Sequence, residues 1–450
     1  MKVKNFISIL FLTISTILVT NANAQDGWEN LFNGENLDGW IQRNGEAEYE
    51  VVDGEIVGTT VAGTPNSFLC TEKNYSDFVF EVELLVEPNM NSGIQFRSLS
   101  LPDYNNGRVH GYQCEVDPSE RAWSAGIYDE ARRGWLYPLD LNPDARKALK
   151  MGHWNKYRIE CIGNSIRTWL NDIPVAHVID DMTSEGFIAL QVHGIGNNKE
   201  KEGEQIKWRN IRIKTENLVP DFYSDIHVEN LVANNLNIVE KKQGFHLLFD
   251  GQSTDCWKNA NTGEFPEQGW QVKNGVLTIL SSRQDSSKKG GDIITKEEFG
   301  PFEFKFDFMY TDGANSGVKY GLGNNGPSIG LEYQILDDEK HPDAKKGVVG
   351  NRTMSSLYDL IPSSKERRFT KGPNEWNRGR VVVYPCGKVQ HWLNGRKVVE
   401  YTRGDNIYKA LVARSKYAGF EGFGMAEKGP ILLQDHHDTV HFRSLKIRNL

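Results

Sequence analysis

Phe302-Glu-Phe-Lys-Phe-Asp-Phe-Met-Tyr310 alternates large apolar residues with mostly polar ones at a period close to two. Successive side chains of a strand point to opposite faces, so this pattern predicts a strand with one face in a core. Phe78-Val-Phe-Glu-Val-Glu-Leu-Leu-Val86 shows a weaker form of the same alternation. Further such runs flank Asn394-Gly395, and Asn-Gly is the favoured two-residue hairpin turn. Many strands joined by Gly, Asn and Asp turns predict an all-β chain made of β-sandwiches.

The chain contains the same long unit twice. The segment Leu31-Phe-Asn-Gly-Glu-Asn-Leu-Asp-Gly-Trp40 recurs as Leu248-Phe-Asp-Gly-Gln-Ser-Thr-Asp-Cys-Trp257, with five of ten positions identical. Asn-Ser-Gly, Trp-Asn, Trp-Leu-Asn and Leu-Gln-x-His motifs then follow in the same order in both copies. Such an ordered set indicates a duplication of a unit large enough to hold its own core. We therefore expect domains at 25–214 and 244–450, joined by a linker at 215–243.

The first residues resemble a targeting segment. Two lysines in Met1-Lys-Val-Lys precede a mostly apolar run from Phe6 to Val19, and small residues lead to Ala24. This is the layout of a secretory signal peptide, which predicts that residues 1–24 are removed. A retained N-terminal anchor is the alternative. We expect a periplasmic or secreted protein that has no membrane attachment after the signal is removed.

Composition narrows the class of ligand. The net charge of −8 does not favour binding to nucleic acid or to an anionic membrane surface, and it suits neutral sugars or small molecules better. Five cysteines without a CxxC pair give no support for zinc or redox chemistry, and we expect isolated buried thiols. No cofactor is expected.

Two strands carry candidate catalytic carboxylates. Because residues i and i+2 share a face, Gln113, Glu115 and Asp117 should project together in the first copy. In the second copy Glu332 and Gln334 should do the same. Each copy thus has one Glu and one Gln, in exchanged order. A carboxylate beside an amide on a concave sheet face suits a polyol. The alternative is an ordinary polar strand face that contacts solvent.

A second pair of residues recurs near the end of each copy. Gln191 and His193 should share one face, as should Gln434 and His436. Histidine is the usual general acid or base near neutral pH, although a hydrogen-bonded structural histidine is the competing interpretation. The segment 434–441 packs three His and two Asp into eight residues, which makes a divalent metal site a weaker alternative. The first copy does not share the extra ligands.

Aromatic and cationic residues could add contacts to a sugar. Trp135 lies in a charged segment, where its ring could stack on the CH face of a pyranose. Arg97, Arg121, Arg132 and Arg133 could bind hydroxyl or carboxylate groups. An ordinary solvated surface explains these residues equally well.

The motifs just described resemble the 3-keto-disaccharide hydrolase family, long called a domain of unknown function. Asn-Ser-Gly-Ile-Gln-Phe-Arg97, Gly-Tyr-Gln-Cys-Glu-Val-Asp117 and Gly-Ile-Tyr-Asp129 carry the resemblance in the first copy. Leu331-Glu-Tyr-Gln-Ile-Leu-Asp-Asp338 and Ile431-Leu-Leu-Gln-Asp-His436 carry it in the second. The resemblance spans nearly all of both copies. It implies a concanavalin-like jelly-roll sandwich in each domain, and export.

The chemistry implied by this resemblance differs from ordinary glycoside hydrolysis, which uses two carboxylates. A ketone at C3 acidifies the hydrogen at C2, so a base can form an enolate and expel the C1 substituent before water adds. Such a route needs one base, donors for the oxyanion and an acid. In the first copy, the implied acid and base groups are Glu115 and His193, with Gln113 and Tyr128 to orient the substrate. In the second copy, they are Glu332 and His436, with Gln334 and Tyr358 to orient the substrate.

Three functions remain open at this point. The first is cleavage of a 3-keto-glycoside or oxidised disaccharide, with an oligosaccharide as partner. The second is a non-catalytic carbohydrate-binding protein with two modules. The third is a conventional glycosidase or polysaccharide lyase. The exchange of Glu and Gln between the copies means that one domain could serve for binding alone.

Overall fold

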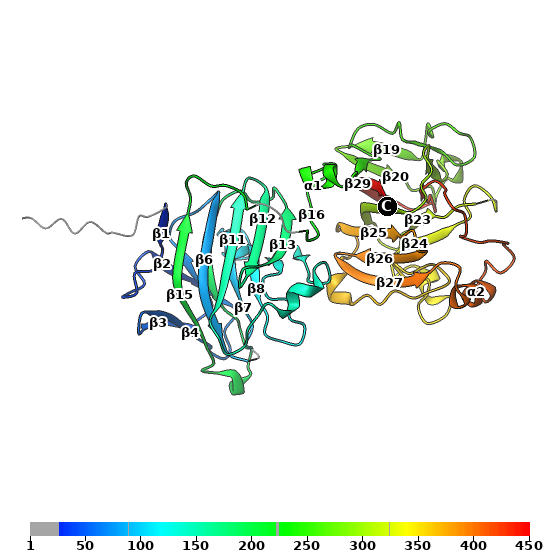
Figure 1. The fold of residues 1–450 in the computed structure, drawn as a ribbon. Coiled ribbons are helices and arrows are strands. Elements are labelled where there is room, and N and C mark those ends of the chain that lie inside the picture. Colours follow the sequence, from blue (N-terminus) through cyan, green and yellow to red (C-terminus); the bar gives the residue numbers. More distant parts are fainter. Residues whose placement is uncertain (1–26, 89, 222–224, 324) are drawn as a thin grey trace, which may run out of the picture.

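The computed structural model describes residues 27–88, 90–221, 225–323 and 325–450. The expected signal peptide at 1–24 lies outside this part of the chain. The two copies stand side by side, and the chain between them carries β16 (Glu229–Asn230) and α1 (Ile238–Lys242) (Figure 1). Within the described ranges, no helix combines the length and the apolar character needed to cross a bilayer.

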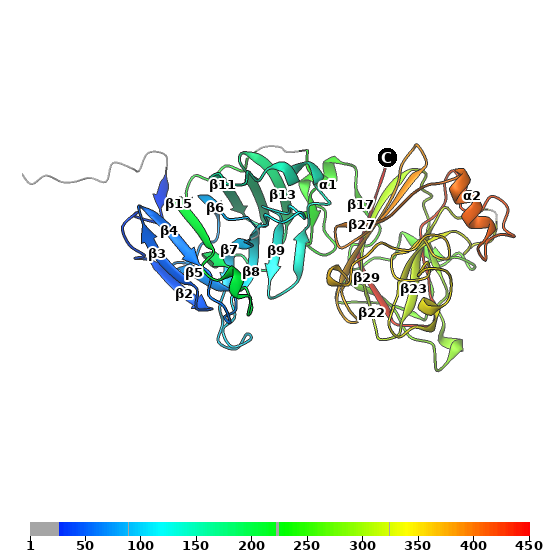
Figure 2. The ribbon, with the colours of Figure 1, turned by 90° about the horizontal axis from the view of Figure 1, so that it is seen from below.

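The first copy is a sandwich of two antiparallel sheets, seen as two layers in Figure 2. The larger sheet also includes β16, in parallel pairing with β13. Its own strands are β1 (Trp28–Asn30), β3 (Glu48–Val52), β4 (Glu55–Thr59), β6 (Phe78–Val86), β11 (Asn155–Ile162), β12 (Ser165–Leu170), β13 (Ile173–Ile179) and β15 (Gln205–Lys214). The smaller sheet holds β2 (Trp40–Asn44), β5 (Ser67–Thr71), β7 (Ser92–Leu99), β8 (His110–Val116), β9 (Ile127–Glu130), β10 (Gly134–Tyr137) and β14 (Phe187–Val192).

The second copy repeats this plan with fewer strands in the smaller sheet. The larger sheet holds β17 (His246–Leu247), β19 (Trp270–Lys273), β20 (Val276–Ile279), β22 (Phe302–Tyr310), β25 (Asn377–Val383), β26 (Lys388–Leu393), β27 (Arg396–Thr402) and β29 (Val440–Asn449). The smaller sheet holds β18 (Trp257–Asn259), β21 (Ile293–Thr295), β23 (Asn315–Tyr320), β24 (Leu331–Leu336) and β28 (Leu432–Leu433). The predicted all-β fold with a sandwich in each copy is confirmed.

Helices are short and lie at the surface or between the copies. Beyond α1, the described chain contains α2 (Asn406–Ala413) in the second copy. Short 3-10 turns lie at η1 (Pro143–Lys147), η2 (Lys199–Lys201), η3 (Ser286–Lys288), η4 (Pro342–Lys345) and η5 (Arg367–Phe369). The η5 turn belongs to the second copy but packs against the first, and this contact positions part of the candidate site.

Alternation along the strands decides which residues face outward. Phe302, Phe304, Phe306 and Phe308 of β22 are all buried in one apolar cluster, as the sequence pattern predicts. Tyr333 of β24 enters the same cluster, with its ring 5.2 Å from that of Phe306. The residues on either side of Tyr333 must therefore point to the opposite face of the smaller sheet. The same rule applies to β8, whose Cys114 and Val116 are buried in the core of the first copy.

The second copy contributes to the apolar packing of the first. The Phe369 ring packs 5.4 Å from the Trp123 ring and belongs to the apolar cluster of the first copy. The Arg396 guanidinium lies over both rings, at 4.9 Å from Trp123 and 4.5 Å from Phe369, and it pairs with Asp140. An aromatic pair with a stacked guanidinium is a stable contact between domains.

The cysteines match the expectation only in part. Cys70, Cys114 and Cys161 are buried thiols, whereas Cys256 is half-buried and Cys386 is exposed. All five are free.

Candidate active site

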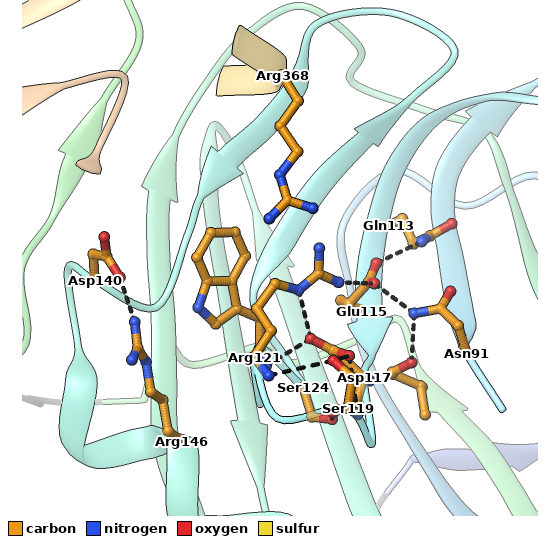
Figure 3. Close-up of polar contacts among 12 residues, drawn as sticks. Asn91, Gln113, Glu115, Asp117, Ser119, Arg121, Ser124, Asp140, Arg146 and Arg368 are labelled. Atoms are coloured by element: carbon orange, nitrogen blue, oxygen red, sulfur yellow. Dashed lines mark hydrogen bonds and ion pairs between the residues drawn. The ribbon is translucent and has the colours of Figure 1, made fainter. Parts of the chain in front are cut away.

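A carboxylate on the outer face of the smaller sheet is the centre of the candidate site in the first copy. Glu115 is 4% exposed and accepts hydrogen bonds from three side chains (Figure 3). Its Oε1 accepts from Asn91 Nδ2 at 2.8 Å and from Arg121 Nη2 at 3.2 Å, and its Oε2 accepts from Gln113 Nε2 at 2.9 Å. Burial raises the pKa of Glu115 to about 7, against the opposing effect of these donors.

Strand register brings further amides to the same place. Gln95 lies opposite Gln113 across β7 and β8, and its Nε2 donates to Gln113 Oε1 at 2.5 Å. Gln191 on β14 donates to the same oxygen at 3.1 Å. Gly93 pairs with Glu115, and a Cβ at that position would lie 2.4 Å from Gln113 Cδ. The absence of a side chain at residue 93 therefore leaves room for Gln113 to reach Glu115.

The turn after β8 holds Arg121 in position. Asp117 Oδ2 accepts from Arg121 Nε at 2.7 Å and from the Trp123 backbone N–H at 3.0 Å. The Arg121 guanidinium packs beside a pair of rings that contact each other, 5.0 Å from Trp123 and 4.9 Å from Trp135. Asp117, predicted to bind substrate, thus orders the turn that presents Arg121 to Glu115.

Tyr128 and Trp135 lie at one side of this cluster. Tyr128 pairs with Gln113 across β8 and β9, and its ring lies 5.3 Å from Trp135. Both side chains are half-buried and line a cleft of about 700 Å³ between the copies. Burial raises the pKa of Tyr128, so its phenol stays protonated and can donate a proton or a hydrogen bond.

His193 lies on a different side from Tyr128. It lines a groove of about 300 Å³ that also contains Asn91, the residue that binds Glu115. Its Nδ1 lies 2.8 Å from the Gly194 carbonyl oxygen. No hydrogen bond or ion pair joins His193 to Glu115 among the described residues, so the two groups predicted as an acid–base pair are not in direct contact.

Arg97, which the sequence suggested as a substrate ligand, is in a structural role. It is 1% exposed, and its Nε and Nη1 donate to the carbonyl oxygens of Ser76 and Gly163 at 2.6 and 2.9 Å. Its Nη2 pairs with Asp77 at 2.9 Å. All three nitrogens are used within the fold. Arg97 lies at a bulge of β7, where its backbone φ is +44°.

The second copy has the same arrangement of strands at this place, but its carboxylate lies at the next cross-strand residue pair on the same face of the sheet. Gly317 pairs with Gln334, where Gly93 pairs with Glu115. Lys319 pairs with Glu332, where Gln95 pairs with Gln113. Glu and Gln have therefore exchanged places in space as well as in sequence, and Gln334 donates to Asn315 Oδ1 at 3.0 Å.

Cations surround the second carboxylate. Lys319 Nζ lies 3.9 Å from Glu332 Oε2. Gln434 bridges the two when its amide is turned so that the nitrogen donates to Glu332 at 3.3 Å and the oxygen accepts from Lys319 at 3.1 Å. Burial raises the pKa of Glu332, while Lys319 and Lys416 oppose that effect. Tyr358 donates to Asp343 Oδ2 at 2.7 Å, and the Lys416 ammonium lies 4.2 Å from the centre of its ring.

His436 is exposed and lies in a separate group from Glu332. His341, His436 and Asp438 bring potential metal ligands within 4.8 Å of one another. Both Asp438 oxygens already pair with Arg283, and Oδ2 also accepts from the Asn315 backbone N–H at 2.9 Å. A divalent ion at this cluster would compete with the Arg283 guanidinium for Asp438.

Several residues of the candidate site were not predicted from the sequence. Asn91 was visible only as part of the repeated Asn-Ser-Gly motif, and Gln95 and Lys319 lie two residues after its glycine. Strand alternation could have found both of these. Lys416 and Arg368 come from distant segments, and no sequence signal points to them.

The chain is thus a tandem β-sandwich protein in which each copy has a buried carboxylate on the outer face of its smaller sheet. The family described as the 3-keto-alpha-glucoside-1,2-lyase-like domain matches residues 27–214 and 244–448, and the chain belongs to that family. The family implies a carbohydrate substrate.

Individual proteins are also similar to parts of this chain. A 3-keto-disaccharide hydrolase of Bacteroides thetaiotaomicron is 29% identical over 242 residues, which cover 48% of this chain and 82% of the relative. A solved structure from Parabacteroides distasonis, described as a "putative glycosyl hydrolase", is 30% identical and covers 48% of this chain and 99% of its own, with a TM-score of 0.42. A second structure from that organism with the same description is 26% identical, covers 46% and 99%, and has a TM-score of 0.35.

Proposed function

We propose that this chain cleaves the glycosidic bond of 3-keto-glycosides, including 3-keto-disaccharides, and that the first copy performs the reaction. The observation that carries this proposal is Glu115, a carboxyl with a pKa of about 7 in contact with Asn91, Gln113 and Arg121. A base is most effective when its pKa lies near the working pH. The 3-keto-disaccharide hydrolase relative supports the choice of substrate.

Each step of the proposed reaction has a group to perform it. The Glu115 carboxylate takes the proton from C2, and the electron pair of that C–H bond moves toward the C3 ketone, which becomes an enolate. The Arg121 guanidinium and the neighbouring amides stabilise the developing oxyanion. The bond from C1 to the leaving oxygen then breaks as the C1–C2 double bond forms, and the Tyr128 phenol protonates the leaving group. Water adds across that double bond to give the 3-keto sugar.

The remaining site residues take supporting roles in this proposal. Gln191 holds Gln113, and His193 binds sugar hydroxyls from the groove beside Asn91. The second copy binds carbohydrate through Glu332, Gln334, Gln434, Tyr358 and His436. The proposal includes export of the protein to the periplasm or to the outside of the cell after removal of residues 1–24.

Non-catalytic binding by both copies is the second candidate. It is favoured by the complete set of hydrogen bonds around Glu115, which is typical of a carboxylate with a structural role.

The decisive experiment incubates residues 25–450 with 3-keto-lactose, 3-keto-trehalose and the unoxidised sugars. We expect glucose and a 3-keto sugar to appear from the keto substrates alone. Release from the unoxidised sugars would instead indicate a conventional glycosidase. Binding without release from any of them would indicate the two-module binding protein.

The pH dependence of this reaction should report the Glu115 carboxyl. The base must be ionised to act, so kcat/KM should rise with pH through about 7 and reach a plateau above it. An ordinary Glu, with a pKa near 4.5, would give a flat profile over the same range. The measurement is kcat/KM for 3-keto-lactose between pH 5 and 9, and a profile that does not change between pH 6 and 8 would contradict the assignment of Glu115 as the base.

A further inference from the structure

The cleft between the copies has walls from both of them. Its volume of about 700 Å³ lies in the range of known ligand sites, and domain interfaces are a preferred place for such sites. Arg132, Arg133 and Trp135 come from the first copy, and Lys371 and Trp376 come from the second. Tyr128 also lines the cleft, and it is the neighbour of Gln113 across β8 and β9. The cleft therefore lies next to the residues that contact Glu115.

Cations outnumber carboxylates among the side chains that line this cleft, in a chain that is acidic overall, and five of the six cations form ion pairs with carboxylates. The protein has 60 Asp and Glu against 52 Lys and Arg, yet only Asp307 and Glu375 bring carboxylates to the lining. Six cationic side chains line it: Arg132, Arg133, Arg368, Lys371, Arg378 and Arg443.

The carboxylates that pair with the arginines of the first copy lie behind them. Asp129, fully buried, pairs with Arg132 and Arg133, and Asp180, 2% exposed, pairs with Arg133. Neither aspartate lines the cleft. The guanidinium groups are thus fixed in orientation by the protein, and Arg133 remains 29% exposed. Fixed cations in front of buried anions suit a negatively charged ligand.

Lys371 differs from its neighbours. Its Nζ donates to the Arg133 carbonyl oxygen, and among the described residues it forms no ion pair with a carboxylate. Burial lowers the pKa of Lys371, and the charge of Glu375 opposes this shift most strongly. An anion bound in the cleft would restore the charge partner that this ammonium lacks.

Aromatic rings give the cleft a second property. Tyr128, Trp135 and Trp376 are half-buried and line it. The Arg443 guanidinium covers one ring, 4.1 Å from the centre of Trp376. Rings beside cations are the combination that holds a sugar ring and a charged substituent together. Arg368 extends from the second copy toward the face that carries Glu115 and Arg121 (Figure 3).

We propose that the cleft between the two copies binds an acidic sugar, whose carboxylate, sulfate or phosphate lies beside Lys371. The choice of a sugar rests on the proposed function, in which this residue of the substrate is the leaving group expelled next to Tyr128. The anion preference itself rests on the cleft alone.

Binding to unoxidised sugars tests this proposal without turnover. Calorimetric titration of residues 25–450 would use methyl β-D-glucuronide, glucose 6-sulfate, glucose 6-phosphate and neutral methyl β-D-glucoside. We expect at least one charged sugar to bind about tenfold more tightly than the glucoside, and the strongest of the three identifies the anion. Higher salt should reduce this preference. Equal affinity for charged and neutral sugars, or no binding, would overturn the proposal.

Two matched variants locate the effect. Lys371→Met should remove the preference for charged sugars and leave the affinity for the glucoside unchanged. Lys409→Met, on the exposed side of α2, should behave as the original protein. If Lys371→Met still prefers charged sugars, the assignment of Lys371 as the partner of the anion is wrong. Cleavage of 3-keto-lactose, a neutral substrate, is measured separately, so loss of the anion preference and loss of the proposed activity are distinguishable.

Discussion

Glu115→Gln should lower kcat for 3-keto-lactose by about a thousandfold, within the range that general base catalysis contributes. The amide keeps the shape of the side chain and can still occupy the space among Asn91, Gln113 and Arg121. It cannot take a proton from C2, so chemistry should fail while the fold and sugar binding persist. Single-turnover release of glucose is the measurement, with circular dichroism as the check on folding.

Glu332→Gln is the matched control in the second copy. It removes the carboxylate that pairs with Lys319, yet kcat should stay within about twofold if the first copy does the chemistry. The opposite pattern, with Glu332→Gln silent and Glu115→Gln active, would move the active site to the second copy. Full activity in both variants would exclude both carboxylates as the base.

Gly93→Ala should reduce kcat/KM by about a hundredfold, because misplacement of a catalytic group by about 1 Å has effects of that size. The new Cβ would lie 2.4 Å from Gln113 Cδ and 2.7 Å from its Nε2, so the amide must leave its place beside Glu115. Glu115 would lose one donor, and Gln191 would lose its acceptor. The backbone of residue 93 is not in the left-handed region, so the effect comes from crowding alone.

Gly317→Ala provides the corresponding change in the other copy. Its Cβ would lie 2.4 Å from Glu332 Oε1, so both variants introduce a similar clash, with a cost to stability of about 1–3 kcal/mol each. Steady-state kinetics and thermal melting of the pair separate catalysis from folding. Equal loss of activity in both variants would show that the effect comes from stability rather than from displacement of Gln113.

The fold was predictable because period-two alternation is a local property. Phe302 to Phe308 indicate their buried face without any knowledge of their partners, and the same rule places Gln113 and Glu115 outward. The duplication was equally visible, since both copies keep Asn-Ser-Gly and Leu-Gln-x-His in order.

Contacts between residues that are distant in sequence could not be predicted from strand alternation. Whether His193 contacts Glu115 depends on how the chain continues after β14, and a strand pattern does not fix that path. Arg97 resembled a ligand because a sequence cannot show the carbonyl oxygens of Ser76 and Gly163 that surround it. The contribution of Phe369 and Lys371 to the first copy depends on how two independent sandwiches pack.

The exchange of Glu and Gln between the copies constrains their ancestry. One pattern cannot become the other by a single substitution, because both positions change. If only Glu and Gln occupied the two positions, the intermediate had either two amides and no carboxylate, or two carboxylates buried side by side, which repel one another. In a protein with a single copy, such a step would remove the only carboxylate of this face or lower the stability of the fold. In a duplicated chain, one copy could pass through such an intermediate while the other kept its carboxylate and its stability.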